Sequence, residues 1–230
     1  MKSTLRYSAA TLLAGALFVS STTVQAQTTL ADLLAGGSIT SGNLIFGSFQ
    51  NATQTGDLTV PFTDITVSAI QSGGDYGIRF QTAQWTLTGV NLSYDLAFDF
   101  HVTTADLTPT MTGNTLSIVG GTDGPGHAQI AETVVELGNN SLAGELVYLN
   151  QTGTGNNRFV DSSAFTGAAQ SEVVVHKDFG MTTTGGDPLA QVFVSHFDQT
   201  FTVTEVPEPS TLALGLMGGL ASLLALRRRS

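Results

Sequence analysis

The sequence predicts an all-β fold for its central part, an antiparallel β-sandwich or jelly-roll-like single domain over residues 27–205. Three observations support this prediction. Apolar residues alternate with polar ones, threonine is frequent in the alternating segments, and glycine-rich turn signals separate these segments. A period of two places successive side chains on opposite faces of a strand, and threonine suits a half-solvated sheet face. About ten such segments with short turns between them are typical of a sandwich.

The elements follow from this pattern in chain order. Only Leu30–Ala35 predicts a helix, of one or two turns. Strands are expected at residues 44–49, 58–67 with a break at Pro61, 76–80, 85–88, 92–102, 115–119, 128–137, 142–150, 173–179 and 192–203. Turns are expected at residues 73–75, 113–114, 120–124, 138–140 and 185–188, where glycine stands beside Asn, Asp, Thr or Pro. The longest strand, 92–102, places its apolar residues on one face.

The charge of the central part restricts its partners. Residues 27–205 hold seventeen acidic side chains against three basic ones, Arg79, Arg158 and Lys177, which gives a formal charge of −14. This charge disfavours nucleic acid and anionic membrane surfaces as partners, because both bind proteins of the opposite charge. The chain has no cysteine, so disulfides, thiolate metal sites and cysteine nucleophiles are excluded. An acidic, cation-attracting body outside the cytoplasm fits this composition.

The N-terminus predicts a secretory signal peptide over residues 1–26. Lys2 and Arg6 precede an apolar segment at 8–19, and Val24-Gln25-Ala26 is a small-residue cleavage site. Cleavage is expected between Ala26 and Gln27. The secretion translocon and signal peptidase are therefore expected partners, and the central domain is expected to be exported.

The C-terminus, residues 206–230, has three parts. The first is a short motif, Val206, Pro207, Glu208, Pro209, Ser210 and Thr211. The two prolines lack N–H donors and favour an extended, low-entropy backbone that a protease cleft accepts. Residues 211–226 carry no charge, and a helix over them would be about 24 Å long, close to the hydrocarbon thickness of a membrane. The third part is Arg227, Arg228 and Arg229, a basic stop that favours the cytoplasmic side.

This tail resembles the PEP-CTERM sorting signal in all three of its parts. The resemblance implies processing by an exosortase, a membrane protease of Gram-negative bacteria. It implies a protein that is held in the inner membrane before processing and is then found at the cell surface or in the extracellular matrix, in association with exopolysaccharide. It leaves the molecular role of residues 27–205 open.

One strand face carries a candidate metal site. Asp95, Asp99 and His101 share the outward face of the strand 92–102, and the last two lie about 7 Å apart along it. Two carboxylates and an imidazole are ligands for a divalent cation, so weak Ca²⁺ binding is one interpretation. A solvated strand face without a ligand is the other. No other cofactor is expected.

Aromatic and hydroxyl groups offer further candidates. Trp85, with Tyr76 and Tyr94, is either a sugar-stacking platform or part of the core, and its alternation with Leu87 favours the core. Ser195 and His196 are neighbours in sequence, which does not make a catalytic triad.

Two functions remain. The first is a non-enzymatic surface or matrix protein with a structural or interaction role. The second is a secreted carbohydrate-binding or carbohydrate-active domain, which requires an exposed aromatic row or a cleft that gathers two acids.

Overall fold

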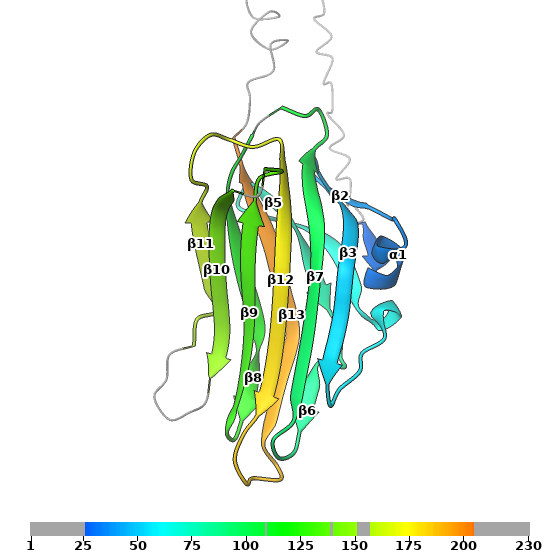
Figure 1. Ribbon diagram of the computed structural model, residues 1–230, viewed down its shortest axis with the longest axis vertical. Helices are drawn as coiled ribbons and strands as arrows, with labels where there is room; N and C mark the ends of the chain where they lie inside the picture. The colour runs from blue at the N-terminus through cyan, green and yellow to red at the C-terminus, as the bar shows by residue number, and fades with distance from the viewer. Residues whose placement is uncertain (1–25, 109, 139, 151–156, 205–230) are drawn as a thin grey trace, which may run out of the picture.

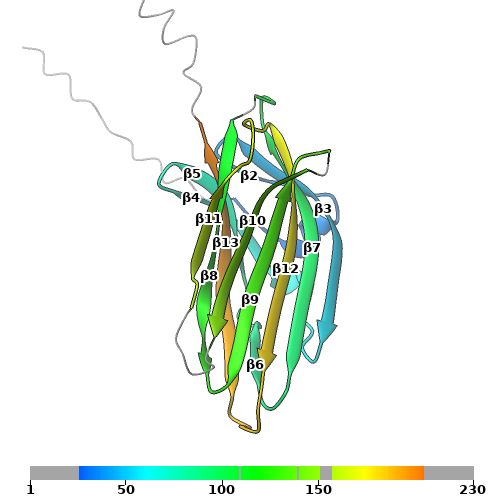
Figure 2. The same cartoon turned by 60° about the vertical axis from the view of Figure 1, so that its left-hand side comes forward.

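The computed structural model describes residues 26–108, 110–138, 140–150 and 157–204. In these ranges the protein is a sandwich of two antiparallel sheets with almost no helix (Figures 1 and 2). The elements in chain order are β1 (Gln27–Thr29), α1 (Leu30–Leu34), β2 (Ile39–Ser41), β3 (Leu44–Gly56), the 3-10 turn η1 (Phe62–Asp64), β4 (Thr66–Ser72), β5 (Asp75–Gln81), β6 (Thr86–Thr88), β7 (Ser93–Thr104), β8 (Met111–Asp123), β9 (Gly126–Val135), β10 (Ser141–Asn150), β11 (Val160–Ala164), β12 (Glu172–Thr183) and β13 (Gln191–Val203).

Each sheet mixes strands from distant parts of the chain. The seven-stranded sheet has the order β1-β4-β5-β13-β8-β11, and β6 also pairs with β13. The six-stranded sheet has the order β10-β9-β12-β7-β3-β2. The last strand, β13, lies between β5 and β8 and is therefore central rather than an edge. The sandwich and its antiparallel pairing confirm the predicted fold class.

The core is formed by the inward side chains of both sheets and is rich in aromatic rings. Along β7, burial alternates as the period of two predicts, with Tyr94, Phe98 and Phe100 buried. Ring centroids of Phe80 and Phe197, which come from paired strands, are 4.8 Å apart. Such stacked and edge-to-face rings contribute beyond the area that they bury.

The short helix also agrees with its prediction. Thr29 caps α1: its side chain accepts a hydrogen bond from the backbone of Asp32, and the Asp32 carboxylate accepts from the Thr29 backbone. This reciprocal capping box satisfies two N–H groups that the first turn leaves free. Leu30 and Leu33 are fully buried, so the helix closes one side of the core.

Several boundaries differ from the prediction. Of the strand predicted at 58–67, only residues 66 and 67 lie in a strand, β4. Residues 58–61 form no strand and Phe62–Asp64 is a 3-10 turn, because Pro61 cannot donate to a ladder. Three short strands, β1, β2 and β11, were not predicted. The turn expected at 113–114 is wrong, because these residues lie inside β8. The turn expected at 120–124 is wrong for residues 120–123, where β8 continues to its end at Asp123.

The glycines of β8 explain why it was misread. A Cβ on Gly113 would lie 2.7 Å from the backbone oxygen of Ser163, and one on Gly120 would lie 2.2 Å from that of Phe193. These glycines are needed because neighbouring strands approach closely, not because the chain turns.

The predicted signal peptide 1–26 and the tail 206–230 lie outside the described residues, apart from Ala26. Within the described ranges, no helix is long and apolar enough to cross a membrane. Ala26 accepts a hydrogen bond from Ala69, and Gln27 begins β1 opposite Ser68. Cleavage between Ala26 and Gln27 stays a prediction, and it would leave β1 at the new N-terminus.

Candidate functional site

The outer face of the six-stranded sheet holds the acids and the histidine that the sequence singled out. Asp99 and His101 on β7 do face outward, but each has its own partner. Asp99 accepts a hydrogen bond from Asn51 at 2.6 Å and lies 2.7 Å from Nδ1 of His176 on β12. His101 Nδ1 lies 3.0 Å from the carboxylate of Glu172. The face is therefore a row of histidine–carboxylate pairs.

Asp95 lies further along the same face and beside another acid. Burial and the neighbouring charge of Asp178 raise the pKa of Asp95. The two carboxylates repel each other, which is the like-charge situation that a bound cation would relieve. Asp95, Asp99 and His101 nevertheless do not converge. Among the described residues, no group of three or more His, Asp or Glu side chains is arranged to hold a metal ion, so the candidate calcium site finds no support in the geometry.

The aromatic platform proposed from the sequence is not on the surface. Trp85 is fully buried and packs against Phe179, with ring centroids 5.0 Å apart. Tyr94 is also buried; its hydroxyl accepts a hydrogen bond from Trp85, and burial raises its pKa to about 12. Tyr76 is half-buried, and a Cβ on Gly42 would lie 2.3 Å from its ring. The expectation that Trp85 belongs to the core is confirmed.

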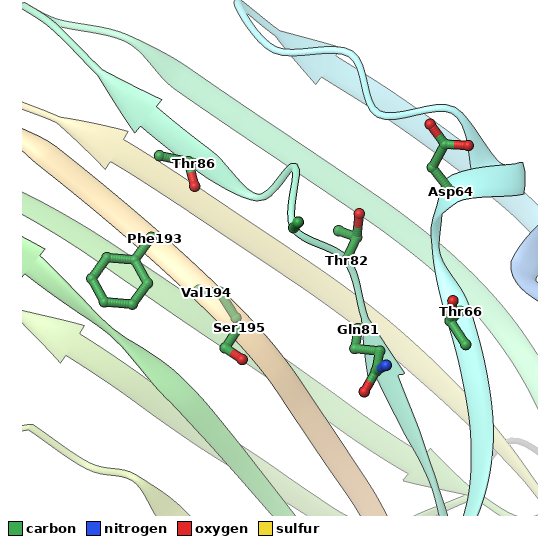
Figure 3. A pocket seen from close by; sticks show the side chains of 9 residues that line it. Asp64, Thr66, Gln81, Thr82, Thr86, Phe193, Val194 and Ser195 are labelled. Atoms are coloured by element: carbon green, nitrogen blue, oxygen red, sulfur yellow. The ribbon is translucent and has the colours of Figure 1, made fainter.

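A cleft of about 520 Å³ lies on the other sheet, where β5 ends and β6 begins beside β13 (Figure 3). Its lining residues are mostly hydroxyl and amide side chains with one aromatic ring: Asp64, Thr66, Gln81, Thr82, Ala83, Thr86, Phe193, Val194 and Ser195. Phe193 is 40% exposed and stands on one side of the cleft, opposite Asp64 and Thr66. Asp64 is the one acid of this lining, and its carboxylate accepts from Gln84.

A bulge in β13 shapes the floor of this cleft. The pairing with β8 shifts between Val194 and His196, so Ser195 and His196 are both at least partly exposed. Ser195 Oγ lies 3.3 Å from His196 Nδ1. The carboxylate of Asp198, two residues on, accepts both of its hydrogen bonds from Arg79, at 2.7 and 2.8 Å. Burial and the Arg79 charge lower the pKa of His196. Because Asp198 is held by Arg79, it does not orient this imidazole as a triad acid would.

A second polar cluster lies inside the sandwich, and sequence reasoning missed it. Five polar side chains point inward between the sheets: Asn114, Glu132, Glu145, Lys177 and Gln199. Lys177 and Glu132 stand directly opposite each other on β12 and β9, and both side chains are fully buried. The Lys177 ammonium donates to Glu132 and to Gln199. We name these five residues the buried polar cluster.

Asn114 connects the two glutamates of the buried polar cluster. Its Nδ2 donates to Glu132 at 2.6 Å and to Glu145 at 2.8 Å. Its Oδ1 and one oxygen of Glu145 are buried without a hydrogen-bond partner. Burial lowers the pKa of Lys177 well below its ordinary value and raises that of Glu145. Burying two acids, an amine and an unpaired carbonyl oxygen costs free energy of folding. The buried polar cluster therefore suggests a role other than stabilising the fold.

The sorting tail continues directly from the central strand of one sheet. β13 ends at Val203, and the backbone N–H of Thr204 donates to the Thr110 carbonyl at 2.8 Å. The motif Val206–Thr211 and Arg227–Arg229 lie outside the described residues.

Comparison with known families identifies this tail. The family model of the PEP-CTERM protein-sorting motif matches residues 205–229, beginning one residue after Thr204. The resemblance seen in the sequence is thereby confirmed. The chain is an exported protein that an exosortase sorts, anchored transiently in a membrane and then processed.

The body has weaker similarities. No curated protein matches the chain. Solved structures similar to it include the carbohydrate-binding module TmCBM61 in complex with β-1,4-galactotriose, with a TM-score of 0.29 and 13% identity over 65% of this chain and 88% of that one. The mannan-recognising module TmCBM27 has a TM-score of 0.30 and 10% identity over 80% and 98% of the two chains. At this level of similarity their ligands indicate nothing about this chain.

Proposed function

We propose that the protein is a non-enzymatic structural or interaction component of the cell surface or extracellular matrix, associated with exopolysaccharide, whose sandwich body is presented by exosortase processing. The observation that carries this proposal is the direct continuation of β13 into the sorting motif. β13 pairs on both sides with β5 and β8, and Thr204 is still hydrogen-bonded to the body. The body is therefore hydrogen-bonded up to Thr204, one residue before the matched sorting motif begins in the sequence.

The outer faces of the body support a binding rather than a catalytic role. Three acid–base pairs lie on them, His176–Asp99, His101–Glu172 and Arg79–Asp198. Asp64 is the single acid of the cleft lining, so the cleft does not gather the two carboxylates that glycoside hydrolysis requires. The Trp85 and Tyr94 rings contribute to the core instead of to a sugar platform.

The experiment is to isolate the extracellular polysaccharide fraction of the producing bacterium and incubate it with the exported protein. The proposal predicts that the protein co-sediments with the fraction and that the chain length of the polysaccharide stays unchanged. Depolymerisation of the polysaccharide would contradict the non-enzymatic role. A protein that stays in the supernatant and is absent from the native matrix would contradict the association.

A second candidate function, carbohydrate binding at a defined site, is favoured by the cleft beside β13. Threonine and serine hydroxyls, the Gln81 amide and the exposed Phe193 ring combine polar partners with an apolar face, as small-molecule sites do. Sugar rings offer the complementary surface.

The Phe193→Ala variant distinguishes this candidate from a general surface interaction. If the cleft binds sugar, the variant loses co-sedimentation, while Val160→Ala, an exposed apolar change on β11 at the edge of the same sheet, keeps it. Equal binding by both variants and the parent would exclude the cleft.

A further inference from the structure

We propose that Lys177 and Asn114 form an intramolecular amide cross-link that joins the two sheets, with Glu132 as the proton-transferring residue. The inference starts from the buried polar cluster, which neither sorting nor surface binding requires. Lys177 comes from β12 in the six-stranded sheet and Asn114 from β8 in the seven-stranded sheet. A bond between them would pin one layer of the sandwich to the other.

The geometry supplies a nucleophile beside a base. Lys177 Nζ contacts one carboxylate oxygen of Glu132, and the other oxygen of the same carboxylate is 2.6 Å from Asn114 Nδ2. The Lys177 amine and the Asn114 amide therefore contact the same carboxylate group, that of Glu132. Complete burial lowers the pKa of Lys177, which favours the neutral, nucleophilic amine. The Phe197 ring lies 5.9 Å from Nζ and adds an apolar wall.

The geometry also supplies a place for the leaving group. Asn114 Nδ2, the nitrogen that has to depart, lies between Glu132 and Glu145, at 2.6 and 2.8 Å. Burial raises the pKa of Glu145, which favours the protonated form of this acid beside the departing nitrogen. Asn114 Oδ1 is buried and has no hydrogen-bond partner in the described residues.

The reaction balances without an oxidant or a reductant. Glu132 takes a proton from the Lys177 ammonium, and the free electron pair of Nζ forms a bond to Cγ of Asn114. The Cγ–Nδ2 bond breaks, and Nδ2 leaves as ammonia with one proton of the former amine, passed through the carboxyl groups. A primary amine and a carboxamide thus become a secondary amide and ammonia.

Gln199 is the competing acceptor, because its Oε1 also contacts Lys177 Nζ. Its amide nitrogen, however, faces only the Thr200 carbonyl, at 3.5 Å. A carbonyl oxygen has no proton to give to a leaving nitrogen, whereas two carboxyl groups surround Asn114 Nδ2. The chemistry therefore selects Asn114, and the Gln199 oxygen holds the amine in position.

The test is mass spectrometry of the exported protein under denaturing conditions. The proposal predicts a mass lower than the sequence value by one ammonia, about 17 Da, the by-product of amine attack on a carboxamide. Cyclisation of an N-terminal Gln27 loses ammonia too, so the loss has to be located in peptides. In the denatured protein, trypsin should fail to cleave after Lys177, and the peptide that contains Lys177 should stay joined to the one that contains Asn114.

Matched variants assign the roles. Asn114→Ala and Glu132→Gln should each abolish the cross-link and restore tryptic cleavage after Lys177, while Gln199→Ala should keep it at least in part. If a variant fails to fold, the peptides of the parent alone decide the matter. A parent cleaved fully after Lys177, or a bond from Lys177 to Gln199 or Glu132, would overturn the proposal.

Discussion

The interior of the sandwich has two halves with opposite chemistry. In one, the rings of Trp85, Phe80 and Phe197 stack at centroid distances of 4.8 to 5.4 Å. In the other, the buried polar cluster places Lys177 and Glu132 where the strand pattern calls for apolar residues. Lys177 Nζ lies 5.9 Å from Phe197, so the halves meet there.

The difference shows what each half contributes. Aromatic packing stabilises the fold by removing apolar surface from water and by ring contacts. A buried ion pair contributes little on balance, because the loss of hydration offsets the attraction between its charges. The polar half therefore contributes little net stability through its charges. It holds Lys177, Glu132 and Asn114 in a specific arrangement, in which we propose that the cross-link forms.

The largest expected effect is in the aromatic half. Phe197→Ala should lower the free energy of unfolding by about 4 kcal/mol, because it removes a ring from a fully buried stack and leaves a cavity. Phe193→Ala, four residues earlier on β13 but 40% exposed, should cost about 1 kcal/mol or less. Urea denaturation measures both, and equal losses would contradict the division between core and cleft.

Removing the amine tests the polar half. Lys177→Met should lower the free energy of unfolding by about 3 kcal/mol, because it removes the cross-link and leaves the buried Glu132 carboxylate without the nitrogen that contacts it. The double variant Lys177→Met with Glu132→Gln removes that charge and should recover part of the loss.

The remainder of that loss is informative. In our account the double variant stays less stable than the parent, because it also lacks the cross-link between the sheets. Recovery to the full stability of the parent would show that the buried polar cluster acts only through charge.

The smallest expected effect is on the outer face, where acids lie side by side. The pKa of Asp95 is raised in the folded protein, so the folded state binds a proton more tightly than the unfolded chain does. Stability from this group is present at low pH and falls as the pH rises through the raised pKa. Asp95→Asn should therefore stabilise the protein at neutral pH, by about 0.5 kcal/mol or less because the site is partly exposed.

The comparison of two pH values isolates this effect. The advantage of Asp95→Asn should disappear below the ordinary carboxylate pKa, where the parent is protonated too. Asp123→Asn, at the exposed end of β8, is the control and should change stability little at either pH. A stabilisation that is the same at both pH values would contradict repulsion between Asp95 and Asp178 as its cause.

The aromatic half could be predicted from the sequence, because its signal is local. The alternation along residues 92–102 predicted which face of β7 is buried. The spacing of Trp85 and Leu87 predicted that Trp85 is buried, and both predictions are confirmed. The polar half also left a signal. Glu132 stands between Ile130 and Val134, in the apolar phase of its strand.

The sequence could not show that the residues of the buried polar cluster lie in contact with one another. Glu132 and Lys177 are far apart in the chain, and only the pairing of β9 with β12 brings them together. Asn114 was hidden because Gly113-Asn114 is a common turn signal, whereas here the glycine allows close strand approach inside β8. The cleft is lined in part by Val194 and Ser195, at a bulge in β13 that no local sequence pattern marks.

The central claim, that an exosortase sorts and processes this body, is tested most directly at the motif. The measurement is the intact mass of the protein from the membrane and matrix fractions of a host with a working exosortase, for the parent and for the variant Pro207→Ala with Pro209→Ala. The alanines restore flexibility and backbone donors in the motif and leave the described body unchanged. Our account predicts a processed parent that lacks the basic end of the tail, Arg227–Arg229, and an unprocessed variant that accumulates in the inner membrane. Identical masses and identical fractions for the two proteins would contradict it.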